Sequence, residues 1–221
     1  MAIDLDPAKL SPAERYKLLI GAIVPRPIAF VSTISTTGQH NLAPYSFFNC
    51  VGANPMLLLF CPANNDDGSE KDTLRNAKPE AEGGTGCFVV NIASEQYARE
   101  VAAAGANLPH GESEFDAVVL TPEPASRVAA PRLAESPLSF ECETERVLRF
   151  AEHQPGGANL VIGRVVSVRA DDGVIDERHR VDADALAAIG RMGGAAYCTT
   201  RDRFDLPRGL DALSANKNPG H

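Results

Sequence analysis

Hydrophobic residues along the chain fall mostly into short runs that suit β-strands. The segments 28–36, 86–92, 138–150 and 159–170 are rich in β-branched and aromatic residues, and the last two alternate between apolar and polar positions. The run 55–61 is continuously apolar, which predicts a strand buried on both faces. These strands do not alternate regularly with helices. The pattern therefore predicts a mainly β fold, an antiparallel barrel of about six strands with a few short helices.

Helices are predicted where capping residues precede a suitable pattern. Ser11, Pro12 and Glu14 form a capping box with proline at the first helical position, so a helix should begin there. After the first long strand, Gly38 indicates a hairpin turn, and Pro44 then marks a strand at a sheet edge. Further short helices are expected at 72–76, 94–105 and 182–190.

Arg26 stands between two prolines, directly before the first long strand. Each proline fixes its own φ, and Pro27 also restricts Arg26 to an extended conformation. Two roles are open for this side chain. Its preorganised backbone favours a contact with a ligand phosphate or with a second subunit. The alternative is a surface ion pair that contributes ~0–1 kcal/mol.

Composition narrows the classes of partner and the location. The chain has 221 residues and a formal net charge of -8, which argues against nucleic acid and anionic membranes as partners. Its start is acidic and unlike a signal peptide, and no run approaches the ~18 apolar residues of a membrane span. We therefore expect one cytoplasmic domain over 1–221, with 1–14 and 205–221 peripheral or mobile.

Familiar catalytic motifs do not occur in the sequence. It contains no G-x-S-x-G, no H-E-x-x-H, no G-x-x-x-x-G-K-[ST] and no G-x-G-x-x-G after the first strand. The five histidines lack metal-ligand spacing, so no metal site is predicted. The five cysteines are widely separated and odd in number, which indicates reduced, mostly buried thiols. We assign no catalytic residue.

Polar side chains gather in two stretches near predicted strand ends. The stretch "NLAPYSFFN", residues 41–49, places small hydroxyl and amide groups beside two aromatic rings. The stretch "SEKDTLRN", residues 69–76, places Lys71 and Thr73 at the start of a helical turn, where free N–H groups and a cation favour an anion such as phosphate. A flat, phosphorylated ligand would use both stretches. The alternative is that the rings belong to the core and the polar groups to turns and caps.

At these residues the sequence resembles the flavin reductase-like family with an FMN-binding split barrel, which includes flavoredoxin-like proteins. The resemblance rests on 25–61, on "KDTLRN" at 71–76 and on "FVVNI" at 88–92, and it covers nearly the whole chain. It implies a six-stranded antiparallel split β-barrel of Greek-key type. It further implies a homodimer with cofactor sites near the subunit interface, non-covalent FMN, and reduction by NADH or NADPH. Electrons would then pass to free flavin, iron or a partner protein.

The resemblance also implies which residues hold the cofactor. The isoalloxazine and the ribityl chain would lie against Thr33, Asn41, Ser46, Phe47 and Phe48. The phosphate would lie at Lys71, Asp72 and Thr73, Arg191 would close the site, and Arg26 is a further candidate for cofactor binding.

One segment departs from the family pattern. Reductases of this group often carry "GDH" before a "VGRV"-like strand, and the histidine is associated with nicotinamide. Here the chain reads "AEHQPGGANLVIGRVV", with His153 ten residues before Gly163. An alternative therefore stays open, a non-catalytic FMN-binding electron carrier without pyridine-nucleotide activity. A weaker one is a barrel that has lost flavin and binds another planar ligand.

Overall fold

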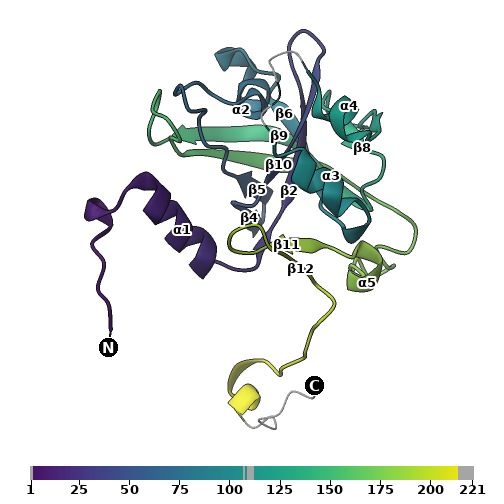
Figure 1. Ribbon diagram of the computed structural model, residues 1–221. Helices are drawn as coiled ribbons and strands as arrows, with labels where there is room; N and C mark the ends of the chain where they lie inside the picture. The colour runs from purple at the N-terminus through teal and green to yellow at the C-terminus, as the bar shows by residue number, and fades with distance from the viewer. Residues whose placement is uncertain (1, 107, 109–111, 214–221) are drawn as a thin grey trace.

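The computed structural model describes residues 2–106, 108 and 112–213. Seven strands form the main sheet: β2 (Ala29–Ile34), β3 (His40–Tyr45), β4 (Phe48–Ala53), β5 (Met56–Phe60), β6 (Cys87–Ile92), β9 (Leu138–Arg149) and β10 (Asn159–Ala170). Their order is β3-β2-β6-β9-β10-β5-β4, and every neighbouring pair is antiparallel. The sheet curves around an apolar interior, with short helices at its rim and on one side (Figure 1).

Smaller elements surround this sheet. A three-stranded sheet contains β1 (Arg26–Pro27), β11 (Ile189–Arg191) and β12 (Tyr197–Thr199), and a two-stranded one contains β7 (Pro122–Glu123) and β8 (Arg132–Leu133). The α-helices are α1 (Pro12–Ala22), α2 (Asp72–Ala77), α3 (Ala98–Ala103), α4 (Glu114–Val118) and α5 (Ala183–Leu186). Short 3₁₀ turns are η1 (Pro7–Lys9), η2 (Glu80–Glu82), η3 (Glu95–Tyr97) and η4 (Gly209–Leu213). Among the described residues, no helix combines the length and the apolar character needed to cross a membrane.

The sheet buries an apolar cluster on each of its two faces. Inside the barrel, Phe60 and Phe88 meet edge to face with ring centroids 5.1 Å apart, and Leu74 of α2 closes this cluster. On the opposite face, Phe30 and Leu42 belong to a cluster that includes residues of α3 and α4, which cover that side of β2 and β3 (Figure 1). The hairpin of β2 and β3 therefore lies between α2 on one face and α3 and α4 on the other.

The mainly β class and several local predictions are confirmed. The capping box at Ser11 and Glu14 is present at the start of α1. Gly38 has φ 89° in the β2–β3 turn, and Pro44 lies in β3, which is an edge strand. The main sheet has seven strands rather than six, because the polar-aromatic stretch forms two strands that separate at 46–47.

Two burial predictions are wrong. In β5 only Leu58 and Phe60 are buried, and Met56 is 42% exposed, because β5 lies next to the edge strand β4 and one of its faces is uncovered. The cysteines are all free thiols, as expected, but among them only Cys87 and Cys142 are buried.

The termini extend away from the barrel (Figure 1). Residues 2–9 are exposed, and Ile20 is the one buried residue of α1. Residues 205–213 lie at the surface, and only Ala212 among them is partly covered. The remainder of the predicted mobile tail, 214–221, lies outside the described residues, so its mobility stays a prediction.

Candidate functional site

Two strands and one helix bring four amide and hydroxyl side chains together. Thr33 of β2 lies directly opposite Asn41 of β3. Thr73 and Asn76 are three residues apart on α2, so they share one helix face. Asn76 Nδ2 donates a hydrogen bond to Thr33 Oγ1 at 3.0 Å, and Asn41 Nδ2 donates one to Thr73 Oγ1 at 2.9 Å. We call these four residues the amide–hydroxyl cluster.

The residues of the amide–hydroxyl cluster differ in how deeply they are buried. Thr33 is fully buried and Thr73 is 1% exposed, whereas Asn41 is half-buried. Each threonine hydroxyl accepts a hydrogen bond and keeps its own O–H free to donate. The two threonines therefore fix the orientation of the amides, and Asn41 is the member that reaches the surface.

Tyr45 adds an unsatisfied donor beside this cluster. Its hydroxyl is buried close to Thr73, yet it has no well-formed hydrogen bond with any described residue. Burial raises the pKa of the Tyr45 phenol, so the group stays protonated at neutral pH. A buried donor without an acceptor costs about 1–3 kcal/mol. Tyr45 is the last residue of β3, but its side chain reaches back towards Thr73, so it adds a donor without an acceptor beside the amide–hydroxyl cluster.

The charges near the cluster are mixed. Lys71 occupies the N-cap position of α2, is half-buried and makes no side-chain cap. Asp72 would oppose a bound phosphate, although its ion pair with Arg75, at 2.9 Å, offsets part of that charge. Glu114 accepts a hydrogen bond from the Leu42 N–H at 3.0 Å, and burial raises the pKa of its carboxyl. Lys71 is thus the residue of this group that favours an anion.

Arg26 is enclosed where α1 meets the barrel. It is 4% exposed, so the surface ion pair that the sequence left open is wrong. Its Nε donates to Ser46 Oγ at 3.2 Å, Nη1 to the carbonyls of Ile20 (2.6 Å) and Ile23 (2.9 Å), and Nη2 to that of Met192 (3.0 Å). Four of its five N–H groups are therefore used within the chain. A cation here also suits the negative end of the helix dipole.

The segment after β3 presents an aromatic surface. Phe47 is 37% exposed, and its ring centroid lies 6.3 Å from that of Tyr16 on α1. Phe48, by contrast, packs against the inner cluster, as the alternative core interpretation expected. Arg191 pairs with Arg26 across β1 and β11, and its guanidinium lies 4.4 Å from the Tyr197 ring centroid. We call Ser46 and Phe47 the aromatic end of β3.

The ten predicted residues therefore fall into two groups, one at each end of β3. Asn41 and Ser46 are five residues apart, which corresponds to about 17 Å along an extended strand. Any ligand that touches both must be elongated and lie along β3. The sequence argument missed Tyr45 and Asn76, although both lie inside the polar stretches and Asn76 follows Thr73 at helical spacing.

The segment that departs from the family pattern lies in the β9–β10 turn, not on β3 or α2. His153 has φ 58° in the β9–β10 turn, and this turn packs on loop 62–70 through Asn64, whose N–H donates to the Gly157 carbonyl at 2.9 Å. His153 lines a cavity of about 200 Å³ together with Glu70 and Arg149. The lining of this cavity includes neither Ser46 nor Phe47, the two residues of the aromatic end.

Comparison with known proteins identifies the family. Residues 21–189 match the family described as "Flavin reductase like domain". The chain belongs to this family. It is 35% identical to nitrilotriacetate monooxygenase component B from Bacillus cereus, with a TM-score of 0.85 over 93% of this chain and 99% of that one. It is 31% identical to the 2-nitrobenzoate 2-nitroreductase NbaA of Pseudomonas fluorescens, with a TM-score of 0.82 over 94% and 97% of the two chains.

A third solved structure supports the architecture. A putative flavin reductase with a split barrel domain, from Shewanella frigidimarina NCIMB 400, is 23% identical, with a TM-score of 0.77 over 94% of this chain and 100% of that one. The predicted split-barrel fold and the family resemblance are both confirmed.

The residues present fit a flavin nucleotide. The amide–hydroxyl cluster and Lys71 offer hydrogen bonds and a cation at one end of β3, and the Tyr45 hydroxyl reaches towards Thr73 from the last residue of the strand. Phe47 offers a flat apolar surface at the other end, next to the Ser46 hydroxyl. This arrangement matches a ligand with a flat ring and a polar, phosphorylated tail.

Proposed function

We propose that this protein binds FMN non-covalently along β3 and passes electrons from NADH or NADPH through the bound flavin. The final acceptor would be free flavin, iron or a partner protein. The observation that carries the proposal is the pairing of an amide–hydroxyl cluster with an aromatic end about 17 Å away on the same strand. Membership of the flavin reductase-like family supports the choice of a flavin as the ligand.

The protein's part in this chemistry is to bind the flavin and to orient it. When bound, the flavin supplies the hydride and electron transfer itself. Lys71 would neutralise the phosphate, and Asn41, held by Thr73, would bond the ribityl chain. Phe47 would cover the ring and keep water from it. Arg26 fixes Ser46 and so the ring end, which makes Arg26 a positioning residue. No side chain is required to move a proton.

A second copy of the chain would complete the site. Helix α1 exposes Tyr16 (55%), Leu18 and Leu19 (48% each), although it lies beside Phe47. The edge strand β4 is also uncovered, and its Val51 is 48% exposed. Apolar surface concentrated on one helix and one sheet edge is typical of a subunit interface. We therefore propose a homodimer whose interface runs past the aromatic end. The five free thiols support a reducing location, the cytoplasm.

An absorbance spectrum and an anaerobic stopped-flow experiment test the function. The purified protein should be yellow or should take up added FMN. Mixing the FMN-loaded protein with NADH or NADPH should then bleach the visible band of oxidised flavin. If FMN binds and dithionite bleaches it, but neither nicotinamide does, the reductase proposal fails.

That failure would instead support the second candidate, an FMN-binding electron carrier without pyridine-nucleotide activity. The observation in its favour is the position of His153, which lies in the β9–β10 turn and lines a cavity with Glu70 and Arg149 but without Ser46 or Phe47. A colourless protein that takes up no FMN would leave the third reading, a barrel that binds another planar ligand.

A further inference from the structure

The last described part of the chain leaves the barrel as an extended segment. Its root is held by two ion pairs, Arg201 with Glu95 at 2.9 Å and Arg203 with Asp184. Residues 204–213, which we call the C-terminal arm, make no hydrogen bond or ion pair with any other part of the chain that the structure describes. Figure 1 shows this arm running away from the barrel towards η4. The arm is therefore fixed at its root and unsupported beyond it.

The C-terminal arm is apolar and conformationally restricted. Pro207 fixes its own φ and keeps Leu206 extended, and Gly209, with φ 68°, makes the turn into η4. The large apolar side chains of the arm are all exposed: Phe204 (67%), Leu206 (57%), Leu210 (82%) and Leu213 (81%). Burial of apolar surface drives association, so an arm that holds these groups in water is suited to a docking surface.

A matching apolar surface lies on α1 and β4, which we call the docking face. Helix α1 and the residue after it expose Tyr16, Leu18, Leu19 and Ile23. Strand β4 lies at a sheet edge and its residues 49–53 are exposed, so its backbone groups and its side chains are both open to a partner. β1 contacts β4 and pairs with β11, which pairs with β12 just before the root of the arm. The docking face and the root of the arm therefore belong to one side of the molecule.

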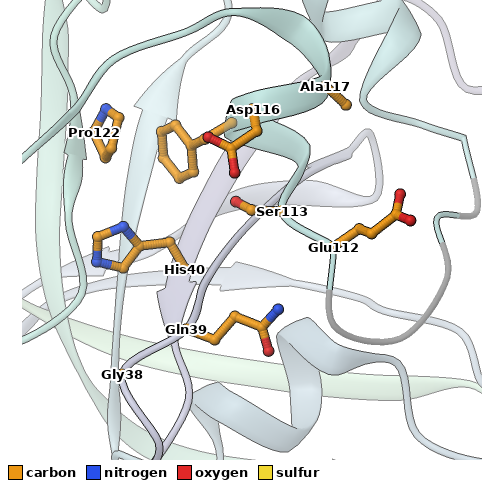
Figure 2. A pocket seen from close by; sticks show the side chains of 9 residues that line it. Gly38, Gln39, His40, Glu112, Ser113, Asp116, Ala117 and Pro122 are labelled. Atoms are coloured by element: carbon orange, nitrogen blue, oxygen red, sulfur yellow. The ribbon is translucent and has the colours of Figure 1, made fainter.

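The end of the barrel at α4 has a different character. There an open cavity of about 630 Å³ lies between the β2–β3 turn and α4, and Figure 2 shows the polar side chains of Gln39, Glu112 and Asp116 on its walls. Most of the exposed large apolar side chains in the described part of the chain belong instead to residues 3–56 and 197–213. Exposed apolar surface concentrated on one side is typical of a protein that binds a partner there.

The charge and the length of the arm suit the docking face of a second subunit. The C-terminal arm contains two aspartates and one arginine, a net charge of -1, whereas α1 contains one arginine, one lysine and one glutamate, a net charge of +1. Opposite net charges favour contact between the arm and this helix. The five residues before η4 span about 17 Å when extended, and η4 adds about 10 Å, which is enough to cross onto a neighbouring subunit.

We propose that the C-terminal arm of one subunit packs on the docking face of a second copy of this chain, so that two subunits exchange arms. Each subunit then gives one arm and receives one, and the assembly closes as a dimer. Because Tyr16 of α1 lies beside Phe47, the received arm would also shield the aromatic end from water. The inference rests on the proposed homodimer for the place of the second copy, but it can be tested without flavin.

Photo-crosslinking of the full-length, flavin-free protein tests the exchange directly. A benzophenone-bearing amino acid in place of Leu210 should give, on irradiation, a covalent dimer on a denaturing gel, and peptide mapping should join the arm to residues 12–23 or 48–56. The same amino acid in place of Val119 is the control, because Val119 is 87% exposed and follows α4 at the other end of the barrel, and it should give no covalent dimer. Crosslinks within one chain, crosslinks to other residues, or none at all would overturn the proposal.

The strength of the dimer gives a second readout. In analytical ultracentrifugation, Leu210→Asp combined with Leu213→Asp should raise the dimer dissociation constant by about a hundredfold, because each dimer contains two arms. The circular dichroism spectrum should be unchanged, since the arm does not bond to its own barrel. Val119→Asp is the matched control and should leave the constant unchanged; its φ of 56° is one that aspartate adopts readily. Equal constants for the arm variant and the unmodified protein would overturn the proposal.

FMN titration of the same preparations separates this inference from the proposed function. A dimer that crosslinks through its arms but takes up no FMN would support arm exchange and refute the proposed flavin site. A protein that binds FMN as a monomer, or as a dimer whose arms crosslink elsewhere, would support the flavin site and refute arm exchange.

Discussion

Replacing Arg26 with alanine removes four hydrogen bonds from one buried guanidinium. The bond to the Ile20 carbonyl is fully buried, and leaving such an acceptor unsatisfied costs about 1–3 kcal/mol. The other three bonds are partly buried, so water replaces some of their energy. Loss of the favourable charge at the end of α1 adds about 0.5–1 kcal/mol. We expect Arg26→Ala to lower the free energy of unfolding by about 3–5 kcal/mol in total.

Urea unfolding, followed by circular dichroism at fixed protein concentration, measures this change. With a urea dependence of about 3 kcal/mol/M for a chain of this size, the midpoint should fall by about 1–1.7 M. Arg164→Ala is the matched control, because Arg164 pairs with Glu145 on an exposed surface, and it should change stability by less than about 1 kcal/mol. Hydrogen exchange should show α1 losing protection before the barrel in Arg26→Lys, a milder variant that keeps the charge. Equal midpoints for the alanine variants would refute the structural role of Arg26.

Three further predictions concern the cluster at α2 and an ion pair nearby. Tyr45→Phe should leave the stability of the flavin-free protein unchanged or slightly higher, because the hydroxyl lacks a partner. The same variant should bind FMN about fivefold more weakly. Equal FMN affinity would show that the hydroxyl contributes nothing. Asn41→Ala should weaken FMN binding by about tenfold in a fluorescence titration while thermal unfolding changes little. Although partial burial opposes ionisation, hydrogen bonds from Arg149 and Lys78 hold the pKa of Glu70 below its usual value. Glu70 therefore stabilises the fold above its unfolded pKa of about 4.3, and that stability is lost as the pH falls towards the lower folded pKa. Glu70→Gln should flatten the acid limb of a stability–pH profile, and an unchanged limb would contradict this.

Local features of the fold could be predicted from the sequence because their causes are local. The capping box of α1, the turn at Gly38 and the edge position of Pro44 each depend on residues that are close in sequence. The pairing of β9 with β10 follows from two long alternating runs joined by a short turn.

Features that depend on long-range packing could not be predicted. Arg26 donates a hydrogen bond to the carbonyl of Met192, which lies 166 residues further along the sequence, and no local sequence pattern predicts that partner. The exposed face of β5 depends on strand order, since only its place beside β4 leaves it uncovered. The sequence placed Thr33 and Asn41 with Ser46 and Phe47 as contacts of the ring and ribityl chain. The structure places Thr33 and Asn41 with Thr73 of α2 instead, at the opposite end of β3 from Ser46, and only the packing of α2 on the strands fixes this.

The most direct test of the proposed flavin site is a crystal structure of the protein with FMN. The account predicts the phosphate beside Lys71 and Asn41, the ribityl chain along β3, and the ring against Phe47 and Ser46. Density for the ring away from the aromatic end, or a phosphate bound elsewhere, would contradict the claim that β3 carries the cofactor.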